Sequence, residues 1–224
     1  MENEHQEVGN FQFLHEENVE KHFAEINYLL LSGKHIDQND YSIFSLLGQF
    51  DDHWKHYYKK LYNLNLVADI FDGQHYFYID FGESRKGKLT DPARQREITP
   101  LQTLVGLVIL DMYYQKYFDK EKIVTWDELM NQIMESDHEK AYKQILFGEI
   151  RGSYDEKEWS LVQKRFGKAL LTFDRLGWIT IRNDNAKSFS FEIRPAIHRL
   201  EKMYIEELKD FDAFSTKFAN KKEL

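Results

Sequence analysis

The sequence predicts a mainly α-helical protein whose helices alternate with short β-hairpins, an α+β fold. Apolar residues recur at helical spacing along most of the chain. Two places, residues 64–81 and 178–193, show paired short apolar runs joined by turn-forming residues, which is the pattern of a hairpin. Because helices precede a hairpin in each half, we predict two tandem winged-helix domains followed by a C-terminal helix.

The clearest helix of the sequence begins at Asp155 and ends before Gly177, which suits the left-handed position after a last turn. Two short strands, 178–182 and 189–193, follow it around the polar, turn-forming run 183–185. A helix that leads directly into a hairpin is the end of a winged-helix domain, where the last helix can enter a DNA groove. At about 100° per residue the apolar residues share one face: Trp159, Val162, Phe166, Ala169, Leu170, Phe173 and Leu176.

The opposite face of this helix carries four basic residues, Lys157, Lys164, Lys168 and Arg175, which we call the basic stripe. They lie within about 20° of one line at helical pitch. Such a stripe suits contact with DNA phosphates, but any solvated helix face can also show one. The periodicity by itself leaves both interpretations open.

The composition excludes several classes of protein. The 224 residues contain no cysteine, which excludes disulfides, thiolate zinc sites and thiol nucleophiles. The polar N-terminus is not a signal peptide, and no apolar run is long enough to cross a bilayer. We therefore expect a cytoplasmic protein with no membrane partner. The net charge of −8 restricts any nucleic-acid contact to local basic faces on an acidic body.

The first half of the chain is predicted to hold a tail at 1–12 and the first winged-helix domain at 13–82. Helices are expected at 14–31, at a short segment capped by Asp40 or Ser42, and from residue 51 to 63. The hairpin turns at Asp72-Gly73, a strong signal for a tight turn.

A basic linker is predicted at 83–98, before the second winged-helix domain at 99–194 and the C-terminal helix and tail at 195–224. Pro100 begins a helix that is apolar on nearly all sides, so we expect the first domain or another chain to help bury it. Thr125 and Glu128 form a capping-box pattern for the next helix. The stretch 135–152 is less regular. The linker holds possible DNA-binding residues that could equally be solvated: Arg85, Lys86, Lys88, Arg94 and Arg96.

The chain shows no pattern of catalytic residues. It has no glycine-rich phosphate loop and no nucleophile elbow. His53 and His56 are three residues apart on a helix, but no further ligand accompanies them, so we predict no metal site. Adjacent carboxylates such as Asp51 and Asp52 point apart on a helix. We therefore expect no enzyme activity and no cofactor.

Four stretches of the chain resemble one known family: residues 29–37 (LLLSGKHID), 56–80, 99–110 (TPLQTLVGLVIL) and 164–179 (KRFGKALLTFDRLGWI). Across residues 24–193 the sequence resembles the MukE/MksE-type subunits of bacterial condensins, which are tandem winged-helix proteins that bind a kleisin (the KITE group). The resemblance rests on fold and surface motifs, because none of these stretches is a catalytic signature.

The resemblance implies a non-catalytic homodimer, formed through the first domain. This dimer would bind a MukF/MksF-like kleisin and, through the kleisin, a MukB/MksB-like SMC-type ATPase. It also implies DNA contact by the helix that carries Lys164, Arg165, Lys168 and Arg175. This helix can be more densely basic in the family, and Asp174 departs from that pattern. The implied processes are chromosome condensation and segregation, or plasmid defence, in the cytoplasm at the nucleoid. The complete set of expected DNA-binding residues is Lys157, Lys164, Arg165, Lys168, Arg175 and Arg182.

The alternative hypothesis is a dimeric winged-helix transcription regulator with sequence-specific DNA binding. The helix favours lysine over the Arg, Asn and Gln side chains that read base edges, which speaks against it. Two winged units where a simple repressor needs one also speak against it. An enzyme with an unrecognised site would need a partly buried polar cluster that the sequence does not indicate.

Overall fold

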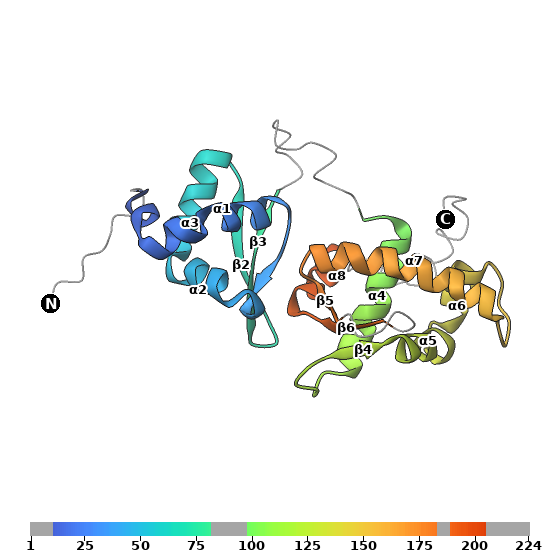
Figure 1. Cartoon of the computed structure of the whole chain (residues 1–224). Coiled ribbons are helices and arrows are strands. Elements are labelled where there is room, and N and C mark those ends of the chain that lie inside the picture. Colours follow the sequence, from blue (N-terminus) through green and yellow to red (C-terminus); the bar gives the residue numbers. More distant parts are fainter. Residues whose placement is uncertain (1–10, 82–97, 183–188, 205–224) are drawn as a thin grey trace. The chain divides into compact units, whose positions relative to one another are not determined.

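The computed structural model describes residues 11–81, 98–182 and 189–204, and the chain falls into two compact units, residues 1–96 and 97–224. The structure confirms a mainly α-helical chain with β-hairpin wings, as Figure 1 shows. Most of the predicted tail and linker, the run 183–185 and the chain after residue 204 lie outside the described residues.

The first unit places three helices before a hairpin. A 3-10 turn, Phe11–His15, precedes the elements α1 (Glu17–Leu31), β1 (Ile36–Asp37), α2 (Tyr41–Gln49), α3 (Asp51–Tyr57), β2 (Asn65–Phe71) and β3 (Gln74–Asp80). A π-helical turn, Tyr58–Tyr62, extends α3. The three strands form an antiparallel sheet in the order β1-β3-β2. The short strand β1 was not predicted from the sequence, and it pairs only two residues with β3.

The hairpin turn of the first unit is the one predicted. Asp72 and Gly73 both have positive φ, 51° and 71°, which a type I′ turn requires. Asp40, one of the two predicted caps, occupies the N-cap position of α2, but its side chain makes no capping hydrogen bond; Ser42, the other, lies within the helix. The Asp40 carboxylate pairs instead with the Lys34 ammonium at 2.9 Å.

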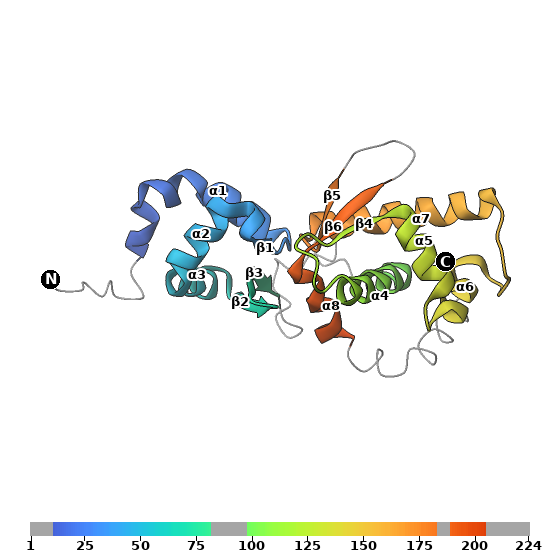
Figure 2. The same cartoon turned by 90° about the horizontal axis from the view of Figure 1, so that it is seen from below.

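The second unit contains four helices before its hairpin and a short helix after it. Its elements are α4 (Pro100–Gln115), β4 (Ile123–Thr125), α5 (Trp126–Glu135), α6 (Glu139–Phe147), α7 (Glu156–Arg175), β5 (Ile179–Arg182), β6 (Ser190–Ile193) and α8 (His198–Met203). The strands form an antiparallel sheet in the order β4-β6-β5, which is visible in Figure 2. The capping box of Thr125 and Glu128 is present as predicted.

Helix α6 was not predicted. Its sequence is charged and has no capping side chain, so local signals are weak. It forms because Ala141, Tyr142, Ile145 and Leu146 are buried in the second unit, where α6 packs against α5 and α7. Local sequence signals favour a helix only weakly here. Packing in the tertiary structure is therefore what makes α6 helical.

Helix α4 is the centre of the second unit. It packs against α5, α7 and α8, so neither the first unit nor a second chain is needed to explain its burial. A Cβ atom at Gly106 would overlap the Cδ1 atom of Leu200 on α8, and glycine therefore permits the close contact of these two helices. The described part of the C-terminal segment thus packs on its own unit.

Candidate nucleic-acid interface on helix α7

Helix α7 is held at both ends by local hydrogen bonds. The Asp155 carboxylate accepts from the Glu158 backbone N–H at 2.8 Å, and the Glu158 carboxylate accepts from the Asp155 N–H in return. At the other end Gly177 has φ 70°. The N–H of Trp178 donates to the Phe173 carbonyl at 2.9 Å, and the N–H of Gly177 donates to the Asp174 carbonyl, as in a Schellman motif. These ends fix where the helix begins and stops.

The apolar face of α7 fixes its rotation. Val162, Phe166 and Phe173 are completely buried, and the Phe173 ring stacks on Trp178 with 5.4 Å between centroids. Trp159 lies only half-buried at the edge of this core, where its ring contacts Trp126 edge-on. Rotation of α7 about its axis would expose these aromatic rings. The packing therefore fixes which residues of α7 face outward.

The basic stripe lies on that opposite face. Lys157, Lys164, Lys168 and Arg175 are all exposed. Within residues 11–81, 98–182 and 189–204, none of their side chains forms a hydrogen bond or an ion pair. Their charges are therefore available to an external anion.

Two exposed leucines flank the basic stripe. Leu161 and Leu171 lie about 40° to either side of its line at helical pitch, and they are 57% and 53% exposed. The outer face of α7 is thus a row of cations with an apolar side chain on each side.

The other two predicted DNA-binding residues on and near α7 already have partners in the chain. The Arg165 guanidinium donates to the Leu146 carbonyl at 3.3 Å, near the end of α6. The Arg182 guanidinium donates to Glu192 at 2.7 Å and to Glu121 at 3.3 Å. Arg165 therefore joins α7 to α6. Arg182 joins the edge strand β5 to β6 and to the residues just before β4.

The ion pairs around Glu192 shift its titration. Burial alone would raise the pKa of this carboxyl group, but hydrogen bonds from Arg182 and Arg194 hold the pKa below its ordinary value. The Arg194 guanidinium donates at 2.9 Å and is nearly buried. Glu192 is therefore ionised at neutral pH and stabilises the base of the hairpin.

Asp174 has a structural role that the sequence analysis missed. Its carboxylate accepts a hydrogen bond from the backbone N–H of Ile181 at 2.9 Å, which ties the end of α7 to strand β5. In the sequence Asp174 is only an acidic residue among basic ones. The folded hairpin brings its carboxylate to the backbone N–H of Ile181, seven residues further on.

The corresponding helix of the first unit differs from α7. On α3 and its extension, Lys55 pairs with Asp51 at 2.6 Å, and Lys59 donates to the side chain of Asn65 at 3.3 Å. The rings of His53 and His56 pack against Phe13 and Phe11 respectively. The possible DNA-binding residues of the linker, Arg85, Lys86, Lys88, Arg94 and Arg96, lie outside the described residues.

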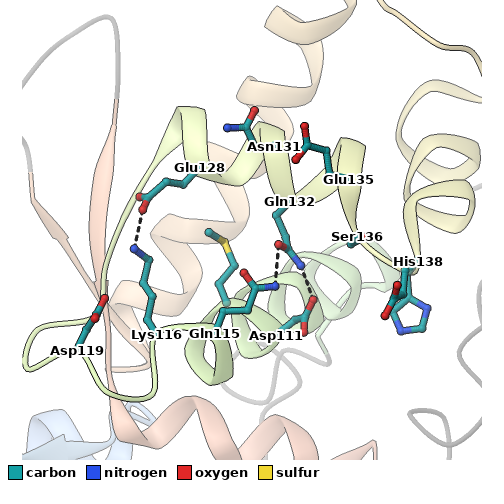
Figure 3. Close-up of a pocket in the computed structure, with 12 residues that line it drawn as sticks. Asp111, Gln115, Lys116, Asp119, Glu128, Asn131, Gln132, Glu135, Ser136 and His138 are labelled. Atoms are coloured by element: carbon teal, nitrogen blue, oxygen red, sulfur yellow. Dashed lines mark hydrogen bonds and ion pairs between the residues drawn. The ribbon is translucent and has the colours of Figure 1, made fainter.

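A polar hollow between α4 and α5 is the second feature of interest in this unit (Figure 3). The Gln132 side chain bridges Gln115, at 2.8 Å, and Asp111, while Lys116 pairs with Glu128 at 2.6 Å. Burial raises the pKa of Asp111, although the hydrogen bond from Gln132 acts in the opposite sense. These groups bond to one another and link the two helices. Asp119, Glu135 and Asp137 make the lining acidic, which does not suit a polyanion.

Together, the fold and the α7 face define a class: a mainly α-helical protein of two helix-and-hairpin units. One unit presents a helix face whose four basic side chains have no partner among the described residues. The family model of the condensin complex protein MksE matches residues 21–205. The chain belongs to this family, and the resemblance noted in the sequence is confirmed. A search of the curated proteins found no match. Among the helices of the described residues, none combines the length and apolar character that crossing a membrane demands.

Proposed function

We propose that this chain is a non-catalytic subunit of a bacterial condensin that dimerises, binds the kleisin and holds DNA through helix α7. Membership of the MksE family supports association with other subunits of a condensin complex. In this proposal the protein acts in the cytoplasm at the nucleoid, in chromosome organisation or in plasmid defence. The two units act as tandem winged-helix domains.

The observation that carries the DNA contact is the basic stripe, which is exposed and whose side chains have no partner in the described part of the chain. Lysine and arginine side chains without internal partners release counterions from DNA when they bind phosphates, and this release favours binding without reading sequence. The rigid end caps and the buried face of α7 hold these four cations in line. Arg165 and Arg182 contribute to this DNA contact indirectly, by holding α7 and the hairpin in position, because both side chains have partners in the chain.

The test is the triple variant Lys164→Ala/Lys168→Ala/Arg175→Ala in the assembled condensin complex, with a short fluorescein-labelled duplex as the probe. We expect the affinity to fall at least about tenfold. The slope of log affinity against log salt should decrease by about 0.9 for each phosphate contact that is lost. Fluorescence anisotropy at several salt concentrations measures both quantities.

The matched control removes the same charge from three exposed lysines that are not part of α7, in Lys60→Ala/Lys120→Ala/Lys140→Ala. We expect this control to bind DNA nearly as the parent complex does. Equal loss in both triple variants would mean that net charge, and not the basic stripe, governs binding. Wild-type affinity in the α7 variant would refute the proposed DNA contact. Strong preference of the isolated chain for one DNA sequence would favour the transcription regulator.

A further inference from the structure

Gly167 lies near the middle of α7, where glycine disfavours a helix relative to alanine. Packing inside the protein does not require it. A Cβ atom built at Gly167 would have no other atom within 4 Å, whereas a Cβ atom at Gly106 would overlap Leu200. The missing side chain at Gly167 therefore leaves open space on the surface of the longest described helix.

This open position lies at the side of the basic stripe, beside Lys164. Gly167 follows Lys164 by three residues and immediately precedes Lys168. Residues three apart are neighbours on a helix surface, and at helical pitch Gly167 lies about 60° from Lys164 and about 100° from Lys168. Both lysines are exposed and have no side-chain partner among the described residues. At Gly167 the helix backbone is thus uncovered next to the charge of Lys164, and Lys168 is the next residue along the chain.

We propose that Gly167 is the point at which the sugar–phosphate backbone of duplex DNA lies against α7, with Lys164 and Lys168 holding neighbouring phosphates. The inference rests on the proposed function and adds the contact position. Without a Cβ atom the DNA backbone approaches the helix closely, so that phosphate oxygens come within hydrogen-bonding distance of both ammonium groups. The adjacent free cations favour a polyanion over a protein helix as the occupant.

The first part of the test compares Gly167→Ala with Gly167→Leu in the same assembled complex and with the same labelled duplex. Alanine should raise the melting temperature of the isolated chain by about 2–4 °C, because it favours the helix. It should nevertheless lower DNA affinity about threefold, and leucine should lower it at least about tenfold. The salt slope should also decrease although no charge is removed, because the added side chain moves phosphates away from the lysines.

The control is Gly48→Leu in α2 of the first unit, since a Cβ atom at Gly48 likewise meets no atom within 4 Å. This variant should keep the affinity and the salt slope of the parent. The double variant Lys164→Ala/Lys168→Ala separates the two proposals. If it weakens DNA binding while both Gly167 variants bind as the parent does, the proposed function stands and the contact position is wrong.

Two further outcomes also overturn the inference. If the lysine variant and the glycine variants all bind DNA normally, the proposed function fails together with it. If Gly167→Leu prevents assembly with the other condensin subunits while the isolated variant binds DNA as the parent does, Gly167 belongs to a protein interface. Should leucine unfold the chain, the more stable alanine variant decides the question through its affinity.

Discussion

The basic residues on and near α7 differ in whether an acidic side chain of the same protein pairs with them. The lysines of the basic stripe have no side-chain partner in the described part of the protein, whereas Arg182 bonds to Glu192 and Glu121. A paired arginine that binds DNA must give up or share these bonds, which reduces its net contribution. For this reason we assign phosphate binding to the stripe and assign structural support of the hairpin to Arg182.

At the residue scale we predict that Glu192→Gln destabilises the protein by about 1–3 kcal/mol at neutral pH, because the charged hydrogen bonds to Arg182 and Arg194 are weakened. The pKa of Glu192 is lowered in the folded state from its ordinary value of 4.5. The stabilisation is therefore complete above about pH 4.5 and is lost as the pH falls through the lower folded value. Urea unfolding of variant and parent from neutral to acidic pH measures this difference.

The same series includes Glu121→Gln as a control, since Glu121 also bonds to Arg182 but is 55% exposed. Its cost should be at most about 1 kcal/mol, as for a surface ion pair. A difference between Glu192→Gln and the parent that stays constant across acidic pH would contradict the assigned role of the carboxylate.

The helices and hairpins are positioned by a few close contacts between elements. The carboxylate of Asp174 joins α7 to β5, and Gly106 allows α4 and α8 to approach. Because α7 also packs on α4, the direction of the basic stripe depends on the packing around α4. A change in the core of the second unit can therefore alter the direction of the proposed DNA-binding face without replacing any of its residues.

At the element scale we predict that Gly106→Ala destabilises the second unit by about 1–3 kcal/mol through overpacking against Leu200. The preference of alanine for helices offsets about 1 kcal/mol of this cost. In a Leu200→Ala background the same substitution should be neutral or stabilising, because its steric partner is absent. A double-mutant cycle by denaturant unfolding gives the coupling. Purely additive free energies would show that the two residues do not interact as described.

The whole molecule combines an acidic net charge of −8 with an exposed basic face on helix α7. The acidic hollow between α4 and α5 belongs to the same unit as the basic stripe, so this unit presents surfaces of opposite charge. Such a distribution orients a protein on DNA and leaves its acidic surfaces to face protein partners. The proposed role within a multi-subunit complex agrees with this distribution.

At the scale of the whole molecule we expect the chain to co-purify with the kleisin and the SMC-type ATPase produced by neighbouring genes, as a dimer of this subunit. Light scattering gives the mass of the isolated chain and of the complex. A monomer that joins neither partner would contradict the proposal. A dimer that forms without these partners and selects one DNA sequence would support a transcription regulator.

The sequence by itself determined the α+β class, both hairpins and the family, because these depend on local signals. Apolar periodicity, the Asp72-Gly73 turn and Gly177 act within a few residues of each other, so their pattern is readable before folding. Only the tertiary structure decided that α6 is a helix, that Asp174 bonds to Ile181, and that Arg182 is paired while the basic stripe has no partner among the described residues. These features depend on burial and on partners distant along the chain, which no local pattern of residues records.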